Sequence, residues 1–93
     1  MRSADRQLQA GIAAAELLPG RDAAEAAAAA LAEATGRFEG CGCRRAAEQA
    51  REAAGLAEQA RSEASADRLG RALARARVSI GLARDRLDRQ GCG

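Results

Sequence analysis

Two regular rows of apolar residues run through the second half of the chain. In each row the spacing alternates between four and three residues, which is the pattern of a coiled-coil stripe. The first row is alanine, and the second is mostly leucine and isoleucine. The rows are Ala46, Ala50, Ala53, Ala57, Ala60 and Ala64, and then Leu69, Leu73, Ala76, Ile80, Ala83 and Leu87. They predict two helices, over residues 44–64 and 66–89.

The two rows are out of phase with each other. The step from Ala64 to Leu69 is five residues, which fits neither spacing of the stripe. This break falls on Ser65-Ala66-Asp67, where a small polar residue can cap a new helix. The pattern therefore predicts a hairpin of two antiparallel helices with its turn near residue 65.

The first half of the chain carries weaker stripes that predict two more helices. The first helix is expected over 4–18. It is expected to end there because Pro19-Gly20 makes a turn. Asp22 and Glu25 have the form of a capping box, which predicts a second helix over 22–39. The expected buried positions are Ala4, Leu8, Ile12, Ala15 and Leu18, and then Ala24, Ala27, Leu31, Ala34 and Phe38.

Together these elements predict an all-α protein: an antiparallel up-down four-helix bundle with alanine-rich, coiled-coil-like hairpins, in a single domain over 1–93. The 93-residue chain has almost no strand-forming residues, with one aromatic in total. Most of its apolar residues are alanine, so the core is thin. A covalent staple or a partner subunit is expected to support it. Two hairpins from two chains, forming a homodimer, are the alternative arrangement.

Three cysteines provide the strongest chemical signal. Cys41 and Cys43 precede the third predicted helix, and Cys92 follows the fourth. The two arms of the hairpin have nearly equal lengths, so Cys92 can reach Cys41 or Cys43. A disulfide there closes a loop of about 50 residues, worth roughly 4 kcal/mol in the chain-entropy model. A structural disulfide with one cysteine left over is the leading hypothesis, and the spacing leaves the choice between Cys41 and Cys43 open.

A metal site at the same residues is the alternative. Three thiolates from Cys41, Cys43 and Cys92 suit copper or zinc. The chain has no histidine, so a closed zinc site needs a fourth ligand, and the nearest candidates are carboxylates such as Glu39. The Cys-x-Cys spacing by itself is a weak metal signal.

The last predicted helix is rich in arginine, and the chain has no lysine. Arg68, Arg71 and Arg75 share one face, which makes contact with nucleic-acid phosphates a second alternative. The net charge is only +2, and acidic residues such as Asp67 are interspersed. We therefore prefer the interpretation of a solvated outer face without a nucleic-acid partner.

The remaining composition argues against other classes of protein. Histidine, lysine, tyrosine and tryptophan are all absent, and no serine lies beside a plausible base, so we expect no enzyme activity. No apolar run approaches the ~20 residues of a membrane span. The first residues do not resemble a signal peptide. If the disulfide forms, we expect a periplasmic or secreted protein whose signal peptide lies outside this sequence; reduced thiols would indicate the cytosol.

Overall fold

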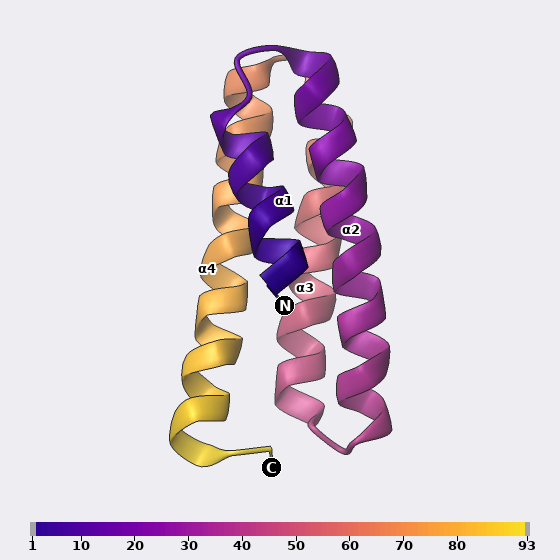
Figure 1. Ribbon diagram of the computed structural model, residues 1–93, viewed down its shortest axis with the longest axis vertical. Helices are drawn as coiled ribbons and strands as arrows, with labels where there is room; N and C mark the ends of the chain where they lie inside the picture. Colours follow the sequence, from indigo (N-terminus) through magenta and orange to yellow (C-terminus); the bar gives the residue numbers. More distant parts are fainter. Residues whose placement is uncertain (1, 93) are drawn as a thin grey trace.

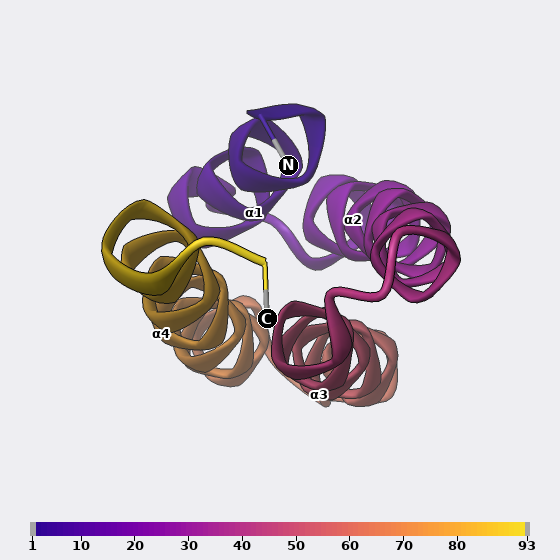
Figure 2. The same cartoon turned by 90° about the horizontal axis from the view of Figure 1, so that it is seen from below.

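The computed structural model describes residues 2–92, and Met1 and Gly93, the ends of the predicted domain, lie outside that range. Within it the protein is all-helical and contains no strand. The helices pack side by side as a bundle, in the order α1, α2, α3, α4 around its axis (Figure 2). Their bounds are α1 (Arg2–Ala13), α2 (Leu17–Gly40), α3 (Arg44–Ala60) and α4 (Ala66–Gln90).

The connections lie at two opposite ends of the bundle (Figure 1). The α1–α2 and α3–α4 connections are at one end. The α2–α3 connection and the end of α4 are at the other, which we call the cysteine end because it holds residues 41–43 and 91–92. Helix α1 has 12 residues, against 24 in α2 and 25 in α4. It covers only the half of the bundle away from the cysteine end, so three helices surround the core near the cysteines.

The two apolar rows of the second half are confirmed as core. In α3 the alanine row is buried from Ala46 to Ala60, and in α4 the second row is buried from Leu69 to Ala83. Leu87 is half-buried, near the cysteine end. Few large side chains are fully buried, as the alanine content predicts. The largest are Leu8, Leu31, Leu69, Leu73 and Ile80.

The turn of the hairpin is longer than predicted. Helix α3 ends at Ala60, not residue 64, and Ala64 is exposed in the connection. The start of α4 agrees with the sequence. Ser65 is its N-cap, and the Ser65 hydroxyl accepts a hydrogen bond of 3.2 Å from the backbone N–H of Arg68. The sequence locates the start of α4 correctly because a cap has a chemical signature, whereas the end of α3 has none.

The predicted turn at Pro19-Gly20 is wrong, and so is the capping box at Asp22. Helix α2 already begins at Leu17, with Glu16 as an extended N-cap. Pro19 is therefore the third residue of the helix. The first N–H groups of a helix have no intrahelical partner, so proline costs no hydrogen bond there. The true connection between α1 and α2 is residues 14–16.

The buried side of α1 also differs from the prediction. Ala4 and Leu8 are buried as expected, but Ile12 is 38% exposed and Leu18, in α2, is 71% exposed. Ala15 is exposed in the connection. The third buried position of α1 is Gly11. A Cβ atom at Gly11 would overlap the side chain of Leu73 in α4, so glycine allows α1 to lie close to its neighbour.

Within residues 2–92, none of the four helices combines the length and the apolar character that a bilayer-crossing segment requires.

Candidate functional site

The connection between α2 and α3 is a tight, fully hydrogen-bonded turn. The N–H of Cys43 donates to the carbonyl of Phe38 at 2.8 Å, and the N–H of Gly42 donates to Glu39 at 3.2 Å. These two bonds form a Schellman motif, which requires a left-handed residue between them. Gly42 supplies it with a φ of 80°. The second glycine of Gly40-Cys41-Gly42-Cys43 thus fixes where the two cysteines lie.

Cys43 joins this turn to the next helix. It is the N-cap of α3, with φ −84° and ψ 69°, and the N–H of Arg44 donates to Gly42 at 3.0 Å. These values define an inverse γ-turn centred on Cys43. The residue is 5% exposed, so the turn directs its side chain into the bundle.

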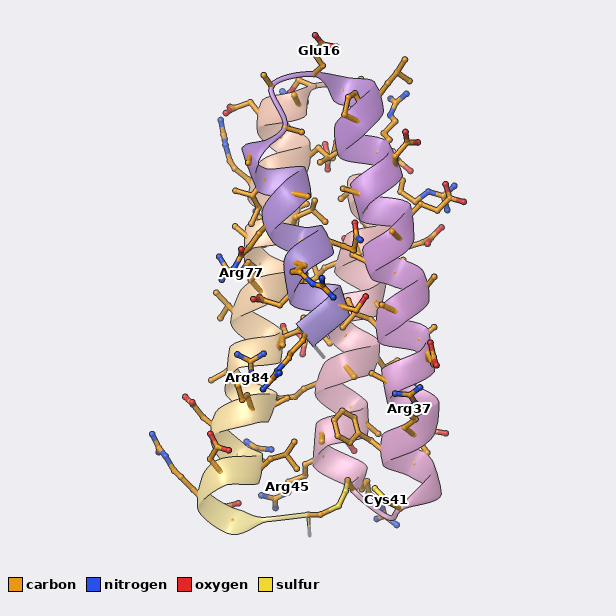
Figure 3. The ribbon with its side chains drawn as sticks, in the orientation of Figure 1. Glu16, Arg37, Cys41, Arg45, Arg77 and Arg84 are labelled. Carbon is orange, nitrogen blue, oxygen red and sulfur yellow. A yellow bond between two sulfur atoms is a disulfide. The ribbon has the colours of Figure 1, made fainter. Side chains whose placement is uncertain are left out.

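A disulfide joins Cys43 to Cys92, with their Cα atoms 4.7 Å apart. The chain reaches this position because Gly91, with a φ of 67°, ends α4 and turns the last residues across the cysteine end (Figures 1 and 3). The structure therefore pairs Cys92 with Cys43 and leaves Cys41 as an exposed thiol. Cys92 reaches this segment as predicted, but the two helical arms are not equal: α3 has 17 residues and α4 has 25.

The remaining thiol lies directly beside the disulfide. The Cys41 Sγ atom is 2.9 Å from the Cys43 Sγ atom and 3.8 Å from the Cys92 Sγ atom. It also donates to the carbonyl oxygen of Phe38 at 3.4 Å. All three sulfur atoms lie within 4.8 Å of one another. The three cysteines singled out in the sequence are thus brought into one cluster.

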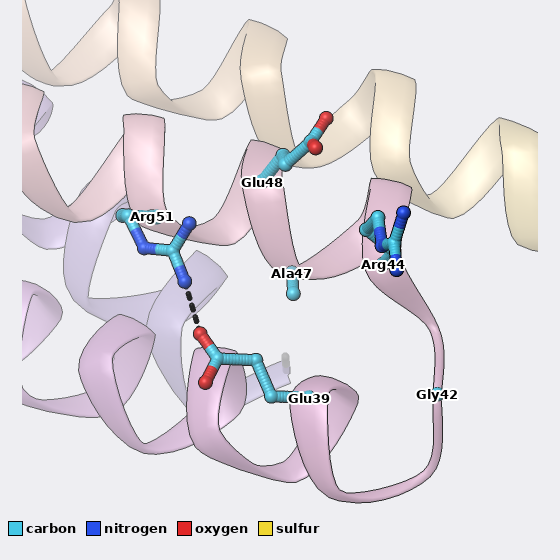
Figure 4. Close-up of a pocket in the computed structure, with 6 residues that line it drawn as sticks. All are labelled: Glu39, Gly42, Arg44, Ala47, Glu48 and Arg51. Atoms are coloured by element: carbon cyan, nitrogen blue, oxygen red, sulfur yellow. Dashed lines mark hydrogen bonds and ion pairs between the residues drawn. The ribbon is translucent and has the colours of Figure 1, made fainter.

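An ion pair braces the turn that carries two of these cysteines. Arg51 on α3 pairs with Glu39 near the end of α2, across a shallow hollow that Gly42 and Arg44 also line (Figure 4). Both side chains are more than half exposed, so the pair adds little free energy. Its consequence for metal binding is larger. The Glu39 carboxylate is already engaged by Arg51, and it is not part of the sulfur cluster.

A second small hollow borders the disulfide itself. It is lined by Cys43, Cys92 and Leu87 and by two arginines, Arg45 and Arg86. Figure 3 shows Arg45 and Cys41 at the same end of the bundle. Sequence reasoning missed both arginines, because Arg45 lies outside the arginine-rich helix and Arg86 lies outside its predicted stripe.

The three arginines of the nucleic-acid alternative lie together in the first half of α4, away from the cysteine end. Arg68, Arg71 and Arg75 are exposed and border one hollow, but Glu63 borders it too. Arg71 is paired with Asp67. The positive face is therefore partly neutralised, and it lies far from the cysteine end in Figure 1.

The surface ion pairs follow helical i,i+3 and i,i+4 spacing only in part. Asp67–Arg71 and Glu58–Arg61 form, the latter at 2.7 Å. Within residues 2–92, no ion pair joins Glu48 to Arg51 or Asp85 to Arg89. Arg51 pairs instead with Glu39 on the neighbouring helix α2. Helical spacing makes a pair possible, but a closer carboxylate on a neighbouring helix competes with it.

Comparison with known proteins adds no family to this description: no family model, no curated protein and no solved structure matches the chain.

Proposed function

We propose that this protein is a small, non-enzymatic, up-down antiparallel four-helix bundle with a structural or interaction role, stapled at its cysteine end. The Cys43–Cys92 disulfide is the observation that carries the proposal. The staple lies where α1 does not reach and where three helices enclose a core made largely of alanine. A covalent link at that position compensates for the missing fourth helix.

Several features support this function over catalysis. Within residues 2–92 the sulfur cluster contains only cysteines, so it includes no histidine or carboxylate that could act as a general base. A stable disulfide also indicates an oxidising compartment, so we propose the periplasm or the cell exterior.

The side chains of Leu18, Val78 and Leu82 are apolar and exposed, so they could contact a protein partner, including a second copy of the chain.

Native mass spectrometry on protein purified without reductant or chelator tests this function. We expect a metal-free species that is two hydrogens lighter than the fully reduced chain, with one thiol open to alkylation. The same spectrum reports whether the particle holds one chain or two. A fully reduced, metal-free species with three open thiols would contradict the stapled bundle.

A second candidate function is soft-metal binding in the reduced protein, and the 3.8 Å separation of the Cys41 and Cys92 sulfur atoms favours it. Two sulfur ligands at about 2.3 Å from one metal ion lie roughly 3.8–4.0 Å apart. The cluster offers three thiolates, and Glu39 is engaged by Arg51, so residues 2–92 place no fourth protein ligand beside the cluster. This donor set fits Cu(I) better than zinc, which prefers four ligands.

The two functions exclude each other at any one moment, because the disulfide uses two of the three sulfur atoms. Metal binding needs prior two-electron reduction of the disulfide, for example by a dithiol. We expect the reduced protein to bind one Cu(I) per chain under anaerobic titration, with thiolate-to-copper absorption in the ultraviolet. The oxidised protein and the Cys43→Ser variant should show neither. Equal copper binding by oxidised and reduced protein would rule this candidate out.

A further inference from the structure

A third sulfur atom lies within reach of the disulfide. A purely structural disulfide does not require such a neighbour. The Cys41 Sγ atom is 2.9 Å from the Cys43 Sγ atom. A disulfide bond is about 2.05 Å long. The two atoms therefore need to approach by only about 0.9 Å to form a bond, which a side-chain torsion can supply.

We propose that Cys41 is an internal attacking thiol that opens the Cys43–Cys92 staple by thiol–disulfide exchange. The proposal rests on the stapled bundle and concerns the regulation of the same site. The Cys41 thiolate forms a bond with the Cys43 sulfur while the Cys43–Cys92 bond breaks. The bonding electron pair leaves with the Cys92 sulfur, which then takes up the proton that Cys41 released. No electrons enter or leave the protein, so no external oxidant or reductant is consumed.

Distance and burial decide which sulfur atom is attacked. Cys43 is the nearer target, since Cys92 is 3.8 Å away. Attack on Cys43 expels Cys92, which is exposed at the end of the chain. Attack on Cys92 would instead expel Cys43, which is 5% exposed and would carry its charge in a poorly solvated place. A better-solvated leaving thiolate makes the first route the faster one.

The surroundings support the same direction of exchange. Arg45 and Arg86 border the hollow shared by Cys43 and Cys92, so positive charge lies close to the leaving sulfur. Gly42, with a φ of 80°, forms the turn between the two cysteines that would become bonded. The exchanged form holds a Cys41–Cys43 disulfide inside the turn and frees the end of α4. The reactive thiol thus moves from residue 41 to residue 92.

Tryptic mapping of the alkylated protein tests the exchange. Trypsin cleaves after Arg37, Arg44 and Arg89, so Cys41 and Cys43 share the peptide 38–44 and Cys92 lies in 90–93. The oxidised protein is incubated without reductant, its one free thiol is blocked slowly with iodoacetamide, and the digest is analysed without reduction. We expect two populations. In one the peptides are linked and the label is on Cys41; in the other, peptide 38–44 is two hydrogens lighter and the label is on Cys92.

Controls separate the failure of the exchange from the failure of the staple. The Cys41→Ser variant should give linked peptides with no label. In the Cys92→Ser variant, air oxidation should form the Cys41–Cys43 disulfide, seen as a loss of two hydrogens. Label on Cys41 alone at every reagent concentration would overturn the proposed exchange while leaving the staple intact. Label on Cys43 in the linked peptides would overturn both the exchange and the Cys43–Cys92 pairing, because Cys92 would then be bonded to Cys41. Label on all three cysteines would contradict the staple itself.

Discussion

Replacement of Cys92 with serine removes the covalent link between the start of α3 and the end of α4, and its cost can be worked out from the structure. The disulfide joins residues 49 apart in sequence. For a loop of that length the chain-entropy relation gives about 4 kcal/mol at 25 °C. A domain of this size loses about 4–8 °C in Tm per kcal/mol. We therefore expect Cys92→Ser to lower Tm by roughly 15–30 °C.

The assay is thermal and urea unfolding followed by far-UV circular dichroism, without reductant. Wild-type protein in a reducing buffer should unfold like Cys92→Ser, because both lack the cross-link. Cys41→Ser is the matched control: it removes a thiol from the same cluster but keeps the disulfide, so its free energy of unfolding should stay within about 0.5 kcal/mol of wild type. Equal stability of wild type and Cys92→Ser in the absence of reductant would refute the reasoning.

Two further predictions concern the helices themselves. Gly11→Ala should lower the free energy of unfolding by a net 1–2 kcal/mol or so, because overlap with Leu73 outweighs the gain in helix propensity. Gly55→Ala, in open space on α3, should raise the free energy of unfolding by up to about 1 kcal/mol. If Gly11→Ala and Gly55→Ala both raised the free energy of unfolding, α1 would not pack closely on α4. Ser65→Ala should cost about 1 kcal/mol through loss of the N-cap bond, whereas Ser62→Ala in the same connection should be nearly neutral in urea titrations, and equal losses would argue against the cap.

Much of the second half of the chain could be predicted from the sequence because its signals are local and redundant. The apolar rows, the phase break and the Ser65 cap each point to the same hairpin. The meeting of Cys92 with the Cys41–Cys43 segment is predicted from the length of the hairpin, although α3 is shorter than α4 and the turn at Gly91 also contributes. The single-domain organisation of the chain remains a prediction.

The errors in the first half have a different physical origin. Proline is compatible with two positions relative to a helix, after its end or within its first turn, and Pro19 occupies the second. The contact of α1 with α4 runs through Gly11, which an apolar pattern does not register. The choice of Cys43 over Cys41 depends on the direction of the turn at Gly42, and only the three-dimensional structure contains that direction.

The short α1 has a consequence for how the protein opens. Asp5 near the start of α1 contacts Arg77 halfway along α4, at 3.0 Å, so the turns of α4 beyond residue 84 have no α1 to cover them. Segments with few buried apolar contacts open locally at a lower free energy than the whole molecule unfolds. Amide hydrogens in 84–90 should therefore exchange with solvent through local fraying, at a rate set by the redox state of the sulfur atoms. Amides around Leu8 and Leu73 should exchange only when the whole bundle unfolds. The amide hydrogens thus fall into two classes of protection against exchange, and the redox state of the cysteines sets the protection of the weaker class.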